Sequence, residues 1–128
     1  MAGPWRVRFV SHDVLTPFIQ DGEWTHDAAV QRRSAEALGY VPCTFWHASD
    51  CAGPCGVVVV CPWCWGFGSI QFVGHAHGGA AVWQYNGNPE VPTVSPSVLN
   101  IASRPGECAM HIWIRDGQIL DAGTPPHG

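Results

Sequence analysis

Glycine and proline interrupt this chain too often for a fold of long helices. Fifteen glycines and eleven prolines are spread over 128 residues, and both residue types favour turns over helix interiors. A chain of this length forms one domain around one core. We therefore expect residues 1–128 to form a single compact β-rich α+β domain, with a small antiparallel sheet and many turns.

Alternating apolar residues and turn dipeptides indicate where the strands lie. Residues 5–10 alternate aromatic or aliphatic side chains with arginines, which is typical of a half-buried strand. The dipeptide Asp116-Gly117 between two apolar runs predicts a tight hairpin, and Asn86-Gly87 predicts a second tight turn. The proline-rich stretch Asn86–Pro96 predicts an extended, well-fixed loop. The other strands are expected at Thr44–His47, Gly56–Val60, Ser69–Val73, Ala80–Tyr85, Ala109–Arg115 and Gln118–Asp121.

One N-terminal segment, Thr25–Gly39, has the signals of an amphipathic helix. Thr25 or Asp27 can cap its start, and Gly39 can end it in a left-handed conformation. One face is mainly apolar, whereas residues 31–33, a glutamine and two arginines, are expected to face outward.

Charge and hydropathy exclude several partners. The chain has no lysine, and its six arginines face ten acidic residues, for a net charge of −4. This balance excludes general nucleic-acid binding and polybasic membrane binding, which need clustered cations. The longest apolar run, Val57–Cys61, is too short to span a bilayer. Residues 1–8 lack the apolar core of an export signal, so we expect a cytoplasmic protein.

The cysteines suggest a metal site. In a reducing cytoplasm, six cysteines favour metal ligands or buried thiols over disulfides. Cys61 and Cys64 form a CxxC turn that can direct two thiolates at one zinc ion. Two buried thiols or a redox pair are the alternatives, although the turn-like residues 65–68 lack the helix that follows a thioredoxin-type motif.

A third zinc ligand is expected at Cys108, which begins a CxxH sequence ending at His111. Cys108 and His111 reach one metal only if residues 105–107 keep Cys108 in a turn. Otherwise His111 points away from the core, on the polar face of its strand. His111 is therefore either the fourth ligand or a side chain directed into a separate site.

Each of the remaining candidate ligands has two alternative roles. An extended strand at 56–60 would separate Cys55 from Cys61 by roughly 20 Å, too far to share one ion. Cys51 and Cys55 then form a second site with Cys43 or His47, or have no role. The pair His75 and His77 is either another metal site or part of an exposed glycine-rich loop.

Two serines are displayed by the proline-stiffened segment that ends in Ser95-Pro96-Ser97. A rigid backbone favours a nucleophile because proximity lowers the barrier only when the reacting group is held in place. A serine hydroxyl also needs a neighbouring base, and His111 is the candidate. These residues leave open which serine reacts.

Four sequence elements together resemble a family of small bacterial and phage proteins that includes BubE. They are the CPxC turn, a tryptophan-containing strand followed by Asn-Gly, the stretch Pro92–Ser97, and the stretch Cys108–Ile119. The resemblance covers residues 43–121 and leaves the helix at 25–39 as an N-terminal extension. It implies a compact β-rich fold and a peptidase that processes a ubiquitin-like protein in operons with E1-like and E2-like enzymes.

The resemblance also assigns residues. Ser95 and Ser97 match the Ser-Pro-Ser positions, His111 matches the motif histidine, and Cys61, Cys64 and Cys108 match the cysteine positions. Asp121, on the expected next strand, is a candidate to orient His111 as the third member of a triad.

Three functions remain open from the sequence. The first is a deubiquitinase-like serine peptidase that cleaves after the C-terminal glycine of a ubiquitin-like protein, with structural zinc. The second is a zinc-dependent hydrolase, in which Glu107 or Asp121 would activate a zinc-bound water. The third is a zinc-stabilised binding module without catalytic activity, such as a phage accessory protein that uses exposed tryptophans.

Overall fold

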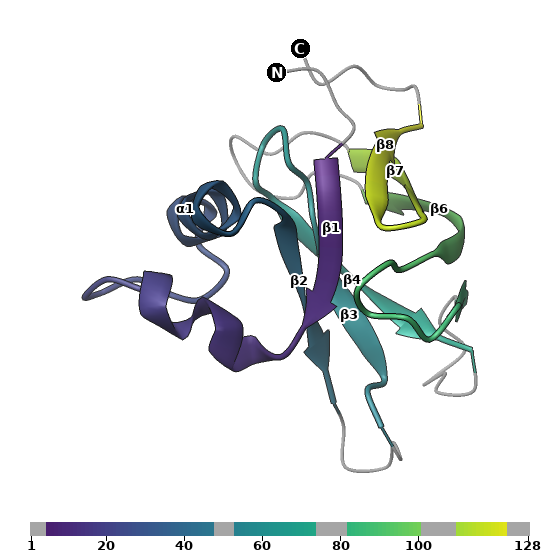
Figure 1. Cartoon of the computed structure of the whole chain (residues 1–128), viewed down its shortest axis with the longest axis horizontal. Helices are drawn as coiled ribbons and strands as arrows, with labels where there is room; N and C mark the ends of the chain where they lie inside the picture. The colour runs from purple at the N-terminus through teal and green to yellow at the C-terminus, as the bar shows by residue number, and fades with distance from the viewer. Residues whose placement is uncertain (1–4, 48–52, 74–81, 101–109, 123–128) are drawn as a thin grey trace.

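The computed structural model describes residues 5–47, 53–73, 82–100 and 110–122. Within them, eight strands form a closed barrel, and one 3₁₀ helix and one α-helix lie outside it (Figure 1). In chain order, the elements are β1 Trp5–Val10, η1 His12–Phe18, α1 Ala28–Leu38, β2 Val41–Trp46, β3 Gly56–Val60, β4 Phe67–Phe72, β5 Val82–Tyr85, β6 Val94–Asn100, β7 Met110–Arg115 and β8 Gln118–Asp121.

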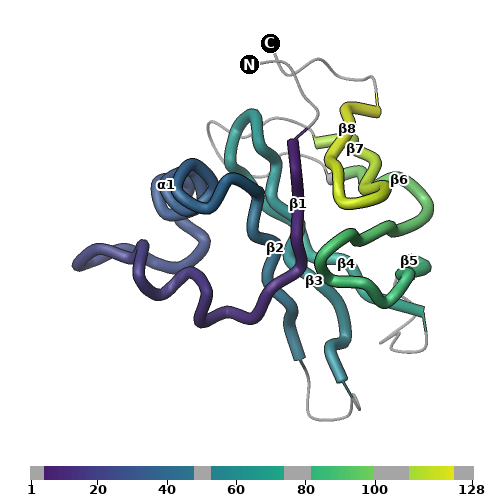
Figure 2. The backbone as a smooth tube through the Cα atoms, in the orientation of Figure 1, coloured from purple at the N-terminus to yellow at the C-terminus, as the bar shows by residue number. Residues whose placement is uncertain are grey.

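The strands lie in the barrel in their sequence order, and β8 closes it by pairing with β1. The β-rich domain with an N-terminal helix is confirmed, but the sheet is not purely antiparallel. The pairs β1–β2 and β4–β5 are parallel. For β1 and β2 the reason is the connection through η1 and α1, which returns the chain to the starting end of β1. Figure 2 shows this crossover passing outside the barrel beside β2.

Alternation of side chains builds the core. Val7 and Phe9 of β1 are buried while its arginines are exposed, as the pattern predicted. The same alternation in β7 buries every second residue. Among the described residues, the main apolar cluster comprises Val7, Phe9, Val41, Cys43, Val57, Val59, Val60, Cys61, Ile70, Phe72, Val94, Val98, Met110, Ile112, Ile114 and Ile119.

The predicted helix is present but begins at Ala28, three residues later than expected. Asp27 precedes it, and its carboxylate accepts a hydrogen bond from the Trp24 amide at 2.8 Å, which stabilises the preceding turn. Gly39 ends it with φ 81°, as predicted. The expected outward position of Gln31 is wrong, because this side chain is fully buried and donates to the Thr25 carbonyl at 3.1 Å.

No helix in the described ranges has the length and apolar character needed to cross a membrane.

The short helix η1 could not be predicted from the sequence, because it contains Pro17 and its apolar residues do not recur at a helical period. A glutamate–arginine pair ties this region to α1: the two Arg33 Nη atoms lie 3.0 and 3.1 Å from the Glu23 carboxylate.

The loop between β5 and β6 is held by side-chain caps, in agreement with the expectation of a fixed loop. Asn88 Oδ1 accepts the amides of Glu90 and Val91 at 3.1 and 3.3 Å, and Asn86 donates to the Val91 carbonyl at 3.0 Å. However, the predicted end of the loop at Pro96 is wrong, because β6 already begins at Val94.

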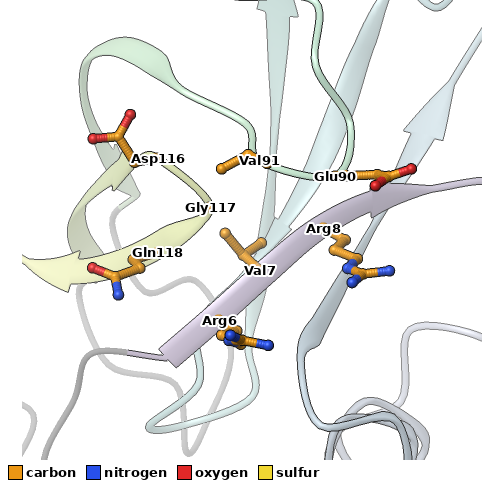
Figure 3. A pocket seen from close by; sticks show the side chains of 8 residues that line it. All are labelled: Arg6, Val7, Arg8, Glu90, Val91, Asp116, Gly117 and Gln118. Carbon is orange, nitrogen blue, oxygen red and sulfur yellow. The ribbon is translucent and has the colours of Figure 1, made fainter.

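The predicted Asp116-Gly117 hairpin joins β7 to β8, with φ values of 49° and 74°. Gly117 also contacts two other segments: its carbonyl accepts the Val7 amide, and its amide donates to the Pro92 carbonyl, both at 2.9 Å. A Cβ atom here would lie 3.1 Å from Val91. Figure 3 shows the Gly117 turn facing Val91 and Val7.

Candidate active site

A bulge in β6 positions the serines. Residues 95–97 of β6 lie opposite the single residue Trp113 of β7, between two regularly paired stretches. The bulge contains the cis Ser95–Pro96 peptide bond. Bulges redirect side chains and are common beside active sites. Pro96 has no amide proton, and an irregular part of a strand is where a sheet tolerates a proline.

The structure brings Ser97 and His111 together. The Ser97 Oγ atom lies 3.0 Å from His111 Nε2, which is within the range of a good hydrogen bond. Both residues are half-buried, whereas Met110 and Ile112 on either side of His111 are fully buried. His111 therefore faces away from the core, as its place on the polar side of the strand predicted. A hydroxyl in contact with an imidazole nitrogen has the geometry for proton transfer.

Hydrogen bonds fix the backbone on both sides of this pair. Trp83 Nε1 of β5 donates to the Ser97 carbonyl at 3.3 Å. The Ala122 amide donates to the His111 carbonyl at 2.8 Å. This contact of Trp83 with Ser97 could not be predicted, because the sequence shows Trp83 only as an aromatic residue in a strand. Its role depends on the pairing of β5 with β6, which the sequence does not show.

The other two candidate residues lie differently. Ser95 is exposed and pairs with Gln84 of β5, and no hydrogen bond of its side chain is seen within the described residues. Asp121 is exposed and pairs with Ile112 of β7. Asp121 is the last residue of β8, and the next residue, Ala122, donates its amide to the His111 carbonyl.

The CxxC segment forms the tight turn between β3 and β4. Cys61 is buried and Cys64 is half-buried, and both are outside any disulfide. The Trp65 amide donates to the Cys61 carbonyl at 2.7 Å, and the Gly66 amide donates to Cys64 Sγ at 3.4 Å. Such a donor to sulfur favours the thiolate that a metal needs. This turn therefore offers two of the four ligands that a zinc ion would need.

Cys108 lies outside the described residues, so the expected three-cysteine set is incomplete here. Among the residues that the structure describes, no three His, Cys, Asp or Glu side chains are grouped as metal ligands. His111 contacts Ser97 instead. The expected sites that involve Cys51, His75 or His77, and the suggested base Glu107, also lie outside these residues.

Two further cysteines correct the sequence interpretation. Cys55 is disulfide-bonded, so the expected preference for thiols fails at this position, and Cys55 cannot serve as a metal ligand beside Cys43 or His47. Cys43 is completely buried, and burial raises the pKa of its thiol to about 12. Cys43 is therefore a protonated core residue, unsuited to bind a metal.

A polar cavity of about 260 Å³ lies at the other end of β7 (Figure 3). Neither Ser97 nor His111 lines it, and its walls come from β1, the β5–β6 loop and the β7–β8 hairpin. The lining residues are Arg6, Val7, Arg8, Glu90, Val91, Asp116, Gly117 and Gln118. The Ser97–His111 pair is thus a surface site on the barrel wall, separate from this cavity.

The family model that matches this chain is BubE, bacterial ubiquitination-like system serine protease, over residues 30–121. No curated protein and no solved structure matches the chain. The matched segment begins inside α1 and ends with the last residue of β8. It includes the CxxC turn, the bulge in β6 and the Ser97–His111 pair.

Proposed function

The chain belongs to the BubE family of bacterial ubiquitination-like system serine proteases, and from this premise we propose that Ser97 is its nucleophile and His111 its general base. The 3.0 Å contact between Ser97 Oγ and His111 Nε2 carries the proposal. Ser95 is the weaker candidate because it is exposed on the β5 side of the bulge. Because His111 Nε2 contacts a serine, we assign His111 the role of a base and not that of a zinc ligand.

The proposed reaction has two steps. Ser97 Oγ attacks the scissile carbonyl carbon while its proton passes to His111 Nε2. His111 then gives this proton to the leaving amine, and an acyl-enzyme remains on Ser97. In the second step, water attacks the ester carbonyl and loses a proton to His111. The acid is released as the bond to Ser97 Oγ breaks, and His111 returns the proton to this oxygen. The Trp83 bond to the Ser97 carbonyl supports both steps because it limits movement of the nucleophile.

The proposed substrate is a bacterial ubiquitin-like protein or its conjugate, cut after the C-terminal glycine. The family's place in a ubiquitination-like system supports this choice. The site supports it too, because Ser97 and His111 lie on the outer face of the barrel and are only half-buried. An extended tail on a folded partner can reach such a site without entering a closed pocket.

A fluorophosphonate probe tests the proposal without a known substrate. This reagent forms a covalent bond with a serine that an adjacent base activates. We expect one adduct per chain, and peptide mapping by mass spectrometry is expected to place it on Ser97. Absence of an adduct, or an adduct on Ser95, would contradict the assignment. Protein unfolded in urea is the control and is expected to remain unlabelled.

We also propose that Cys61 and Cys64 hold a structural zinc ion together with Cys108. The tight turn and the Gly66 amide bond to Cys64 Sγ support this proposal. Zinc would supply a cross-link between turns in a small domain and would take no part in catalysis.

Alkylation with iodoacetamide tests the zinc proposal. Cys64 is expected to react at least about tenfold faster after treatment with a chelator, because a metal-bound thiolate is shielded from the reagent. Cys43 is the internal control, since burial and its raised pKa keep it protonated and unreactive while the core is intact. Equal Cys64 reactivity with and without chelator, together with no zinc by elemental analysis, would contradict the proposal.

A further inference from the structure

An exposed leucine lies beside the Ser97–His111 pair. Leu99 of β6 pairs directly with His111 of β7, so the two side chains share the outer face, with Cβ atoms about 4.5–5.5 Å apart. Leu99 is 57% exposed, while Val98 beside it is buried. A large apolar side chain in water is stabilised when another apolar group covers it. Leu99 therefore offers an apolar contact next to the proposed base.

The other side of the pair is also apolar. Trp113 faces the bulge that carries Ser97, and it shares the outer face of β7 with His111. It is half-buried, and the guanidinium carbon of Arg115 lies 4.0 Å from its ring centre. Cation–π stacking of this kind holds the aromatic ring in place. The register thus places Ser97 between the level of Leu99 and the level of Trp113 along the barrel wall.

We propose that Leu99 and Trp113 contact substrate side chains on the two sides of the scissile bond, and that the substrate is a polypeptide with apolar residues there. The proposal rests on the proposed function, because it takes Ser97 as the point of cleavage. Leu99 is two residues from Ser97, about 7 Å along an extended strand. This spacing suits a side chain one or two residues from the scissile bond of an extended substrate.

Binding of two peptides to the Ser97→Ala protein tests this surface without turnover. The probes are fluorescein-labelled Ala-Leu-Gly-Leu-Ala and Ala-Ser-Gly-Ser-Ala, and fluorescence anisotropy gives each Kd. The leucine peptide is expected to bind at least about tenfold more tightly, because it buries apolar surface. Adding Leu99→Ser is expected to reduce this preference to less than about threefold. Val73→Ser is the matched control: Val73 is 47% exposed and lies outside the site, so its replacement is expected to leave the preference intact.

Several results would overturn the inference. They are no measurable binding of either peptide, equal Kd values for both, or a preference that survives Leu99→Ser. A change in molecular mass on Leu99→Ser with unchanged peptide preference would show that Leu99 covers a second copy of the chain, and would also overturn it. A failure of the proposed function would be detected in a separate experiment, in which protein with Ser97 intact is not labelled by the fluorophosphonate probe.

Discussion

Replacing Ser97 with alanine is expected to lower the kcat for p-nitrophenyl acetate hydrolysis by at least about 10³-fold. The reason is that Ser97 alone of the two serines contacts a base, His111, at 3.0 Å. Replacing Ser95 with alanine removes the same hydroxyl two residues away and is expected to change kcat by less than about threefold. The measurement is the steady-state rate of both variants and the wild type, with far-UV circular dichroism to show that each is folded.

The same pair predicts how a second substitution behaves. His111→Gln keeps a polar side chain but removes the base, so it is expected to cause a loss of similar size. Residues that act as one unit are strongly non-additive, and the double variant is therefore expected to be no slower than Ser97→Ala alone. Wild-type kcat in Ser97→Ala, or a large loss in Ser95→Ala, would contradict the assignment of the nucleophile.

Replacing Gly56 with alanine is expected to cost at least about 4 kcal/mol of the free energy of unfolding, a size reserved for a few specific mechanisms. Gly56 begins β3, and a Cβ atom there would lie 1.9 Å from the Ile70 carbonyl oxygen of β4 and 2.7 Å from Trp46 Nε1. Trp46 Nε1 donates to this same carbonyl at 3.1 Å. The new methyl group therefore collides with backbone and breaks a hydrogen bond, and no side-chain rotation relieves the contact.

Urea unfolding measures this cost, and Gly53 supplies the control. A Cβ at Gly53 would meet nothing within 4 Å, so Gly53→Ala is expected to stay within about 0.5 kcal/mol of the wild type. If Gly56→Ala is expressed in insoluble form while Gly53→Ala is soluble, this would also indicate a large loss of stability at Gly56. Equal unfolding midpoints for the two variants, with unchanged m-values, would show that the strand shifts to accept the methyl group.

Features set by neighbouring residues could be predicted from the sequence. The alternation at residues 5–10, the Asp116-Gly117 turn and the helix end at Gly39 all depend on local backbone preferences and side-chain period. The outward orientation of His111 followed from the same period. These signals fixed where most strands lie and which face of each one is buried.

Features set by distant contacts could not be predicted. The start of strand β6 has no strand pattern in the sequence, because Pro96 lies there between two serines. Only its pairing with β5 and β7 reveals the strand. The burial of Gln31 could not be predicted, because it depends on a hydrogen bond to a backbone carbonyl in the preceding turn. The choice between Ser95 and Ser97 also needed the bulge, since both belong to one short motif.

The pairing that closes the barrel has a consequence for how the chain folds. Trp5 of β1 pairs with Ile119 of β8, so this contact joins residues 114 positions apart in sequence. Its formation carries a large loop-closure entropy, and proteins rich in such non-local pairs fold in milliseconds to seconds rather than microseconds. Until that step, β1 and β8 each have an edge that can pair with another chain. The pairing that joins the two ends of the chain is thus also the one that removes the open edges of β1 and β8.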